Sequence, residues 1–325
     1  MQLRKGKMNG ITDVAGVKTG HVTLYEKVND QDTVCTGVTA ILPHDGNLFR
    51  QKVRAGSAVI NGYGKTAGLV QVDELGLLES PIMLTNTFSV GAVMQGTLTY
   101  MLEQDPGIGD TESSINIVVG ECNDSYLNAM RLQAVQPEHA IEAIKSASDG
   151  PVEEGAIGAG KGMVCFGYKG GIGTASRVAE GYTVGCLVLS NFGKREDARF
   201  ADFNQVQMDT PDGSIMIVIA TDAPLYDRQL QRLAKRCAAG LGRAGSHISH
   251  GSGDIAFAFS TANTYDHQSD SQMDSLSFIR DDHPVMNELF QAVVEATEEA
   301  VISSLRNAET TEGRKGRMVE KAPLD

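Results

Sequence analysis

The stretch RAGSHISHGSGDIAFAFSTAN, residues 243 to 263, ends in an apolar segment that is typical of a buried strand. The residues before this apolar segment include two histidines and three glycines, and Ser252 lies between Gly251 and Gly253. A turn accounts for this arrangement, because Gly and Ser are common turn residues. A nucleophile that must be approached closely from both sides accounts for it as well. The stretch by itself leaves both interpretations open.

Similar glycine-rich turns recur along the chain, which contains 36 glycines. The short apolar segments between them predict strands at 36–42, 58–61, 115–120, 162–168, 182–189, 214–221 and 255–261. Apolar residues at helical spacing predict helices at 89–102, 127–135, 137–147, 223–245 and 283–308. The polar tail 309–325 is expected to be frayed.

These elements predict the fold class. Several strands are apolar on both faces, which is typical of sheets that are covered on both sides. Strands and helices intermix without a linker, a repeat or a regular βαβα alternation. We therefore expect a single α/β domain over residues 1–325, with helices packed outside two stacked sheets.

The composition and net charge of the chain disfavour some classes of binding partner. The chain has 325 residues with 41 acids and 28 bases, a formal net charge of −13, which disfavours nucleic-acid and anionic-membrane surfaces. No apolar run is long enough to cross a bilayer and the basic N-terminus lacks the apolar stretch of a signal peptide, so a cytoplasmic protein is expected. Five widely spaced cysteines predict neither disulfides nor a metal site, and small buried thiols are the simplest interpretation.

A second glycine-rich segment, GAGKG at 158–162, looks like a phosphate-binding loop. Such a loop needs a helix after it, but a strand-like segment follows here, and Lys161 is not followed by Ser or Thr. Tight turns and a bulge explain the segment better.

Two polar side chains end apolar strands. Glu121 closes VVGE and is followed by Asn123 and Asp124, which are good helix caps. A carboxylate at the end of a strand also suits the binding of a substrate ammonium. Asn191 follows the strand at 182–189, where its amide either ends the strand in a turn or donates to a developing oxyanion.

The histidines in the opening stretch offer a base for Ser252. The GxSxG pattern of many serine hydrolases is absent, because His250 occupies the position of the first glycine. His247 or His250 could still form a Ser–His arrangement, although both lie in a loop that fixes an imidazole poorly.

Together these segments resemble a known family: the self-processing N-terminal-nucleophile peptidases that include the L-aminopeptidase D-amidase/D-esterase and the β-peptidyl aminopeptidases. The similarity covers almost the whole chain. It rests on residues 10–24, 77–94, 118–128, 158–177, 183–193, 250–263 and 290–301, in this order.

The resemblance implies a four-layer αββα sandwich, similar in layering to the Ntn hydrolases, with the different connectivity shared with ornithine acetyltransferases. It also implies that the chain cuts its own Gly251–Ser252 bond into chains 1–251 and 252–325. Gly251 leaves room for the attacking hydroxyl. The free α-amine of Ser252 would then act as base, because the pKa of an α-amine in a peptide is about 7.7–8.0.

The other site residues follow from the same resemblance. Asn191 matches the oxyanion-hole asparagine, and Glu121 matches the acid that holds the substrate ammonium. In the segment ATEEA, Thr297 and Glu299 look like a hydroxyl and a carboxylate that flank the nucleophile. Some members carry an aromatic residue where this chain has Asn123.

The expected function is a serine aminopeptidase or amidase that releases N-terminal amino acids from small peptides, amides or esters through an acyl-enzyme. The resemblance implies no metal or organic cofactor and a homotetramer of processed protomers. The acidic composition indicates no nucleic-acid or membrane partner. The alternatives are an acyltransferase of the ornithine acetyltransferase type and a non-catalytic metabolite-binding protein.

Overall fold

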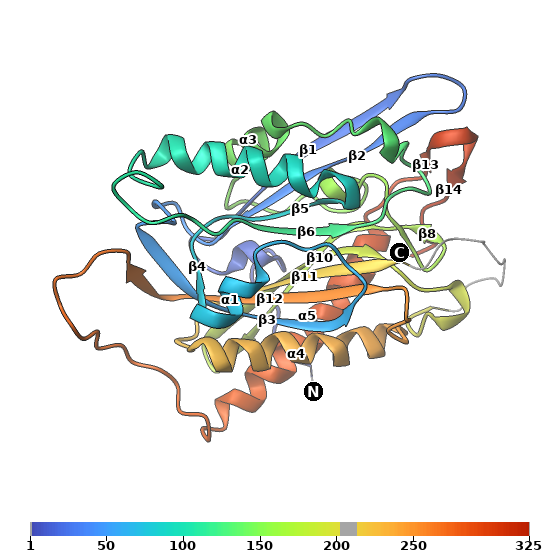
Figure 1. Ribbon diagram of the computed structural model, residues 1–325. Helices are drawn as coiled ribbons and strands as arrows, with labels where there is room; N and C mark the ends of the chain where they lie inside the picture. Colours follow the sequence, from blue (N-terminus) through green and yellow to red (C-terminus); the bar gives the residue numbers. More distant parts are fainter. Residues whose placement is uncertain (1, 202–212, 325) are drawn as a thin grey trace.

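Two stacked β-sheets lie between two layers of helices in the structure, a computed structural model that describes residues 2–201 and 213–324 (Figure 1). Helices α2 and α3 cover the outer face of the smaller sheet, and α4 and α5 cover the outer face of the larger one. The expected αββα layering is therefore confirmed.

The larger sheet has the strand order β4-β3-β12-β11-β10-β9. Its β11 and β12 are parallel, and its other neighbours are antiparallel. The strands are β3 (Gln51–Gly62), β4 (Leu77–Leu78), β9 (Gly171–Ala179), β10 (Tyr182–Asn191), β11 (Ser214–Thr221) and β12 (Gly253–Asp266).

The smaller sheet has the order β1-β2-β5-β6, with β5 and β6 parallel. Its strands are β1 (Lys18–Lys27), β2 (Thr33–Leu42), β5 (Ile82–Asn86) and β6 (Val118–Cys122). Two short hairpins complete the strands: β7 (Val164–Cys165) with β8 (Tyr168–Lys169), and β13 (Thr311–Glu312) with β14 (Met318–Val319).

The helices are α1 (Leu69–Leu75), α2 (Val90–Gln104), α3 (Pro137–Lys145), α4 (Asp227–Ala244) and α5 (Val285–Arg306). Pro at the first position of α3 suits a helix start, because its missing N–H would have no intrahelical partner there.

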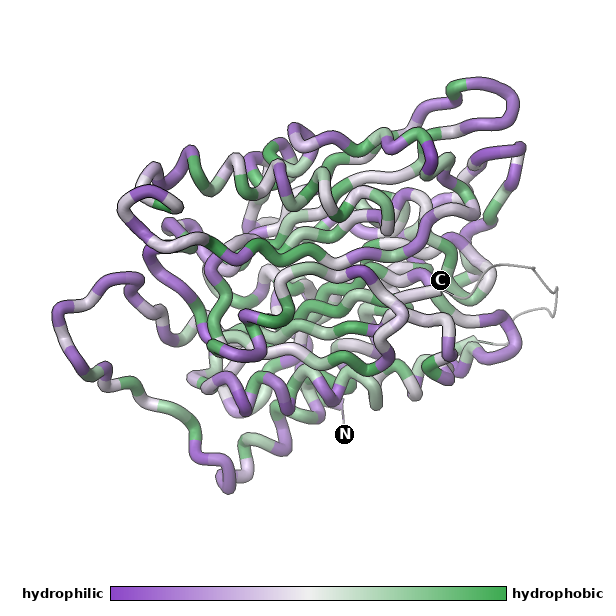
Figure 2. The backbone as a smooth tube through the Cα atoms, in the orientation of Figure 1, coloured by the Kyte–Doolittle hydropathy of each residue, from purple (hydrophilic) through white to green (hydrophobic). Residues whose placement is uncertain are grey.

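The strands of the larger sheet are largely hydrophobic along the chain (Figure 2), and their side chains fill a core on each face of the sheet. On β10, Leu187 and Leu189 point to the core between the sheets, whereas Cys186 and Val188 point to α4 and α5. This alternation follows from the two-residue period of a strand. It explains why the strands are continuous apolar segments in the sequence.

Several elements differ from the sequence prediction. The segment 162–168 is divided into β7 and β8, because Phe166 and Gly167 adopt positive φ angles of 49° and 67° and reverse the chain. The helix expected at 127–135 is only a 3-10 turn at Met130–Leu132. Strands β1, β5 and β9 and helix α1 were not predicted. Strands β1 and β9 contain many polar and small residues, and β5 and α1 are only 5 and 7 residues long.

The C-terminal tail also differs from the prediction. Instead of fraying, it forms β13 and β14, buries Val319 and Ala322, and its Glu320 carbonyl accepts the N–H of Lys169 at 2.8 Å.

Candidate active site

Ser252 lies in a turn that leads into β12. Its N–H donates to the carbonyl of Ser249 at 3.0 Å, which closes the turn around His250 and Gly251. The side-chain amide of Asn61 on β3 donates to the carbonyls of Ser249 at 3.1 Å, His250 at 3.2 Å and Ser252. The register between β3 and β12 shifts beside Asn61, a bulge of the kind that often re-aims a side chain near a site. Asn61 therefore holds both sides of the Gly251–Ser252 bond.

The hydroxyl of Ser252 is buried and paired with a carboxylate. Ser252 is 4% exposed, and its Oγ donates to Oδ1 of Asp254 at 2.6 Å. Burial raises the pKa of Asp254 to about 6, although the hydrogen bond from Ser252 opposes this rise. Sequence analysis did not assign Asp254. No sequence pattern indicated this contact, because Ser252 precedes the first residue of β12 and the alternation of side chains along a strand does not extend to it.

Pairing of β10, β11 and β12 brings Asn191 to the same end of the sheet as Ser252. Asn191 pairs with Ser214, whose Oγ accepts the N–H of Gly253 at 3.1 Å. Oδ1 of Asn191 accepts the N–H of Val164 at 2.9 Å, and its Nδ2 donates to the carbonyl of Asn123 at 2.9 Å. An amide nitrogen carries two hydrogens, so Nδ2 has a second donor.

The hairpin that orients Asn191 is held by a buried lysine. Lys169 is fully buried, and its Nζ donates to the carbonyls of Gly160, Met163 and Gly170 at 2.7–2.9 Å. Burial lowers the pKa of Lys169 to about 7. These three bonds fix the segment from which Val164 reaches Asn191.

Glu121 lies on the other sheet, opposite the start of β12. It is 2% exposed; its Oε1 accepts the N–H of Lys65 at 2.9 Å, and its Oε2 accepts the hydroxyl of Thr87. A Cβ atom placed on Gly64 would lie 3.6 Å from Oε1 of Glu121 and 3.8 Å from the Cα of Gly253. Glu121 is therefore close to the nucleophile segment, and only neutral donors contact it in the described part of the chain.

Thr297 does not lie beside Ser252, so the expectation that it flanks the nucleophile is wrong. Its Oγ1 lies 3.9 Å from Sγ of Cys186, in the layer between α5 and the sheet. Strand pairing places Cys186 of β10 beside Ile219 of β11, and Ile219 beside Ala258 of β12. Ala258 is four residues along β12 from Asp254. At about 3.3 Å per residue this distance is roughly 13 Å along the strand.

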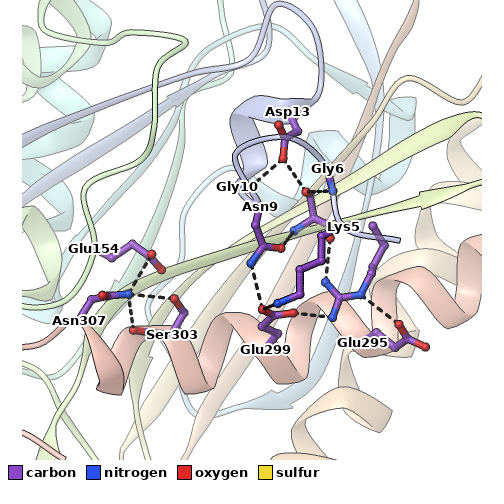
Figure 3. A network of polar contacts seen from close by, with 12 residues as sticks. Lys5, Gly6, Asn9, Gly10, Asp13, Glu154, Glu295, Glu299, Ser303 and Asn307 are labelled. Atoms are coloured by element: carbon purple, nitrogen blue, oxygen red, sulfur yellow. Dashed lines mark hydrogen bonds and ion pairs between the residues drawn. The ribbon is translucent and has the colours of Figure 1, made fainter. Parts of the chain in front are cut away.

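Glu299 belongs to an ion-pair network near the N-terminus, which corrects its expected place beside Ser252 (Figure 3). Its carboxylate accepts from Lys5, from Asn9 at 2.9 Å and from Arg177 at 2.5 Å. Burial alone would raise the pKa of Glu299, but the bonds from Lys5 and Arg177 hold it below its ordinary value. The neighbouring Glu298 pairs with Arg243 at 2.6 Å. Both acids tie α5 to its surroundings.

Neither His247 nor His250 is hydrogen-bonded to Ser252 in the described part of the chain. His247 contacts Asp197 at 3.0 Å, and the ring of His250 lies 6.4 Å from that of Tyr63. Both side chains are exposed.

The GAGKG segment packs against β2. A Cβ on Gly162 would lie 2.3 Å from the carbonyl of Cys35, so the glycine allows a close approach of two backbones. This agrees with the turn interpretation. All five cysteines are buried free thiols, as expected.

The structure contains no candidate metal site within residues 2–201 and 213–324, because no three His, Cys, Asp or Glu side chains in these ranges lie close enough together to hold a metal ion. No helix in these ranges has the length and apolar character needed to cross a membrane.

The sequence is similar to those of known peptidases. The sequence model of peptidase family S58 matches residues 9–319. A β-peptidyl aminopeptidase, BapA, from Sphingosinicella microcystinivorans is 41% identical over 98% of this chain and 87% of its own.

Two solved structures are similar to this chain over nearly its full length. The PH0078 protein from Pyrococcus horikoshii has a TM-score of 0.92 at 49% identity, covering 99% of this chain and 93% of its own. The L-aminopeptidase D-Ala-esterase/amidase from Ochrobactrum anthropi has a TM-score of 0.91 at 33% identity, with the same coverages. That protein is described as a prototype of the serine aminopeptidases and as a new variant of the Ntn hydrolase fold.

Proposed function

The chain belongs to peptidase family S58, and on this basis we propose that it is a self-processing serine aminopeptidase that cuts itself between Gly251 and Ser252. One observation carries the proposal: a buried serine hydroxyl, directly after a glycine, lies at the sheet end that also holds Asn191 and faces Glu121.

Cleavage would turn Ser252 into an N-terminal residue with both a nucleophile and a base. Its α-amine, whose ordinary pKa is about 7.7–8.0, takes the hydroxyl proton near neutral pH. Oγ attacks the substrate carbonyl, the leaving amine departs protonated, and water then hydrolyses the acyl-enzyme. The scheme uses only groups of this chain and water.

Asn191 would stabilise the reaction intermediate, and Glu121 would bind the substrate. The second N–H of Asn191 Nδ2 stabilises the oxyanion of the tetrahedral intermediate. Glu121 binds the substrate ammonium, because a buried carboxylate contacted only by neutral donors gains most from a cationic partner.

The substrates we propose are small peptides, amides and esters with a free N-terminal amine. Support comes from the relatives, whose names describe a β-peptidyl aminopeptidase and an L-aminopeptidase D-Ala-esterase/amidase. An acyltransferase of the ornithine acetyltransferase type, which uses a threonine nucleophile, fits Ser252 less well.

The processed protein is proposed to act as a cytoplasmic homotetramer. The resemblance to the family supports the tetramer, and five unpaired thiols suit a reducing compartment. Light scattering of the cut protein tests the assembly; a monomer would refute it.

The activity is tested by offering purified protein a panel of aminoacyl p-nitroanilides with L-, D- and β-amino acids, and acetylornithine with glutamate as acceptor. Release of p-nitroaniline from substrates with a free amine is expected. Acetyl transfer without hydrolysis would support the acyltransferase, and no turnover of any substrate by cut protein would support the binding protein.

A further inference from the structure

Self-cleavage needs a general base other than the α-amine that serves as base in the cut enzyme. The α-amine of Ser252 is the base only after cleavage, because before it the same nitrogen is part of the Gly251–Ser252 amide and is not basic. The uncut chain must therefore place another acceptor beside Oγ of Ser252. This inference rests on the proposed self-cleavage.

We propose that Asp254 is the general base of self-cleavage and the acid that protonates the departing nitrogen. Its Oδ1 already accepts the hydroxyl of Ser252 at 2.6 Å, the length of a hydrogen bond from a hydroxyl to a carboxylate. Asp254 is 1% exposed, so water competes little for this bond.

The surroundings of Asp254 keep it basic. Its Oδ2 is buried and has no hydrogen-bond partner among the described residues, and no ion pair within the described ranges involves it. A carboxylate with few donors and no cation binds a proton more readily than one in a salt bridge. The raised pKa of about 6 agrees with this and leaves most of the group ionised at neutral pH.

Other candidate bases are less well placed. His247 is paired with Asp197, and His250 is exposed. Both oxygens of Glu121 are engaged, by the N–H of Lys65 and the hydroxyl of Thr87.

The chemical steps balance. Asp254 takes the proton of Oγ as Oγ bonds to the carbonyl carbon of Gly251, giving a tetrahedral intermediate. The C–N bond then breaks, and its electron pair accepts the proton from Asp254, which leaves an ester between Gly251 and Ser252. Water hydrolyses this ester to the Gly251 carboxylate, the Ser252 hydroxyl and the free α-amine.

The test follows cleavage of newly made full-length chain in a cell-free translation pulse–chase, with and without hydroxylamine, which cuts esters. Asp254→Asn keeps the shape and removes the base, so the chain is expected to convert at least about 100-fold more slowly than wild type, with or without hydroxylamine. Ser252→Ala gives the uncut reference.

Asp73→Asn is the matched control. The hydroxyl of Ser57 on β3 donates to Oδ1 of the exposed Asp73 on α1 at 2.6 Å, a serine–carboxylate contact of the same length away from Ser252. We expect the control to be cut at the wild-type rate.

The outcomes separate the two proposals. An uncut wild type refutes self-cleavage itself. Cutting of Asp254→Asn at the wild-type rate, or its cutting only in hydroxylamine, refutes the role of Asp254 in the acyl shift while self-cleavage stands. If thermal unfolding shows that Asp254→Asn is not folded, Asp254→Glu decides: faster cutting than Asp254→Asn supports the proposal, and a folded, uncut Asp254→Glu refutes it.

Discussion

The N–H of Val164 donates to Oδ1 of Asn191 at 2.9 Å, which determines the orientation of the Asn191 amide. With Oδ1 occupied, the nitrogen side of the amide is directed to the carbonyl of Asn123 and keeps one hydrogen for a ligand. A side chain held in this way is pre-organised as a donor, and its orientation costs nothing at the moment of reaction.

Removal of this donor should slow turnover. Asn191→Ala is expected to lower kcat by about 10²–10³, the usual effect of deleting one oxyanion-hole donor. Steady-state kinetics of cut protein with an L-aminoacyl p-nitroanilide measure the change. A variant with unchanged kcat would show that Asn191 only ends β10.

Glu121→Gln should separate substrate binding from self-cleavage. The substitution keeps the shape but removes the charge, so kcat/KM for substrates with a free amine should fall by about 10²–10³. Self-cleavage should persist, because the Gly251–Ser252 bond presents no ammonium. Electrophoresis and kinetics on the same sample test both halves, and an uncut chain would contradict the assignment.

Ser252→Ala should leave a folded, uncut and inactive chain of 34.6 kDa. Ser252→Cys should still cut, because a thiol is more nucleophilic than a hydroxyl near neutral pH. Mass spectrometry of wild type should give a chain that begins at Ser252. Wild-type hydrolysis rates in Ser252→Ala would refute the nucleophile.

Thr297→Val tests whether Thr297 has a catalytic role. Its hydroxyl lies beside the sulfur of Cys186 at 3.9 Å and also interacts with the thiol of Cys237, and its methyl group packs against Gly240. We therefore expect kcat/KM close to that of wild type, because the substitution removes no group that contacts the proposed site. A loss near that of Asn191→Ala would restore the role that the family resemblance implies.

His21 should make the protein less stable in acid. Burial lowers the pKa of His21 to about 4, below its ordinary 6.5, and its Nε2 has no partner in the described chain. The unfolded chain therefore takes up the proton first as the pH falls. The contribution of neutral His21 is complete above pH 6.5 and is lost progressively toward pH 4, by up to about 3 kcal/mol.

Urea unfolding at pH 7 and at pH 4.5 measures this effect. His21→Asn removes the titrating group, so its free energy of unfolding should fall less between the two pH values than that of wild type. An equal fall in both proteins would mean that other groups cause the loss.

Strand prediction succeeded where apolar runs are continuous. The bounds predicted for the strand at 214–221 are those of β11, because a strand covered on both faces has an uninterrupted apolar sequence. The prediction failed at 127–135, where apolar residues occur at helical spacing but only the 3-10 turn at Met130–Leu132 forms. There the buried side chain of Asn128 bonds Asp124 and the N–H of Cys35, which ties the segment to β2.

The sequence by itself determined the two apolar faces of the strands, the Gly251–Ser252 pair and the family resemblance, because each depends on neighbouring residues or on their order. Only the tertiary structure decided which groups meet Ser252. Strand register and helix packing set those distances, and both depend on contacts between residues far apart in the chain. They place Asn61, Asp254 and Glu121 around Ser252, and they place Thr297 and Glu299 in the outer layer.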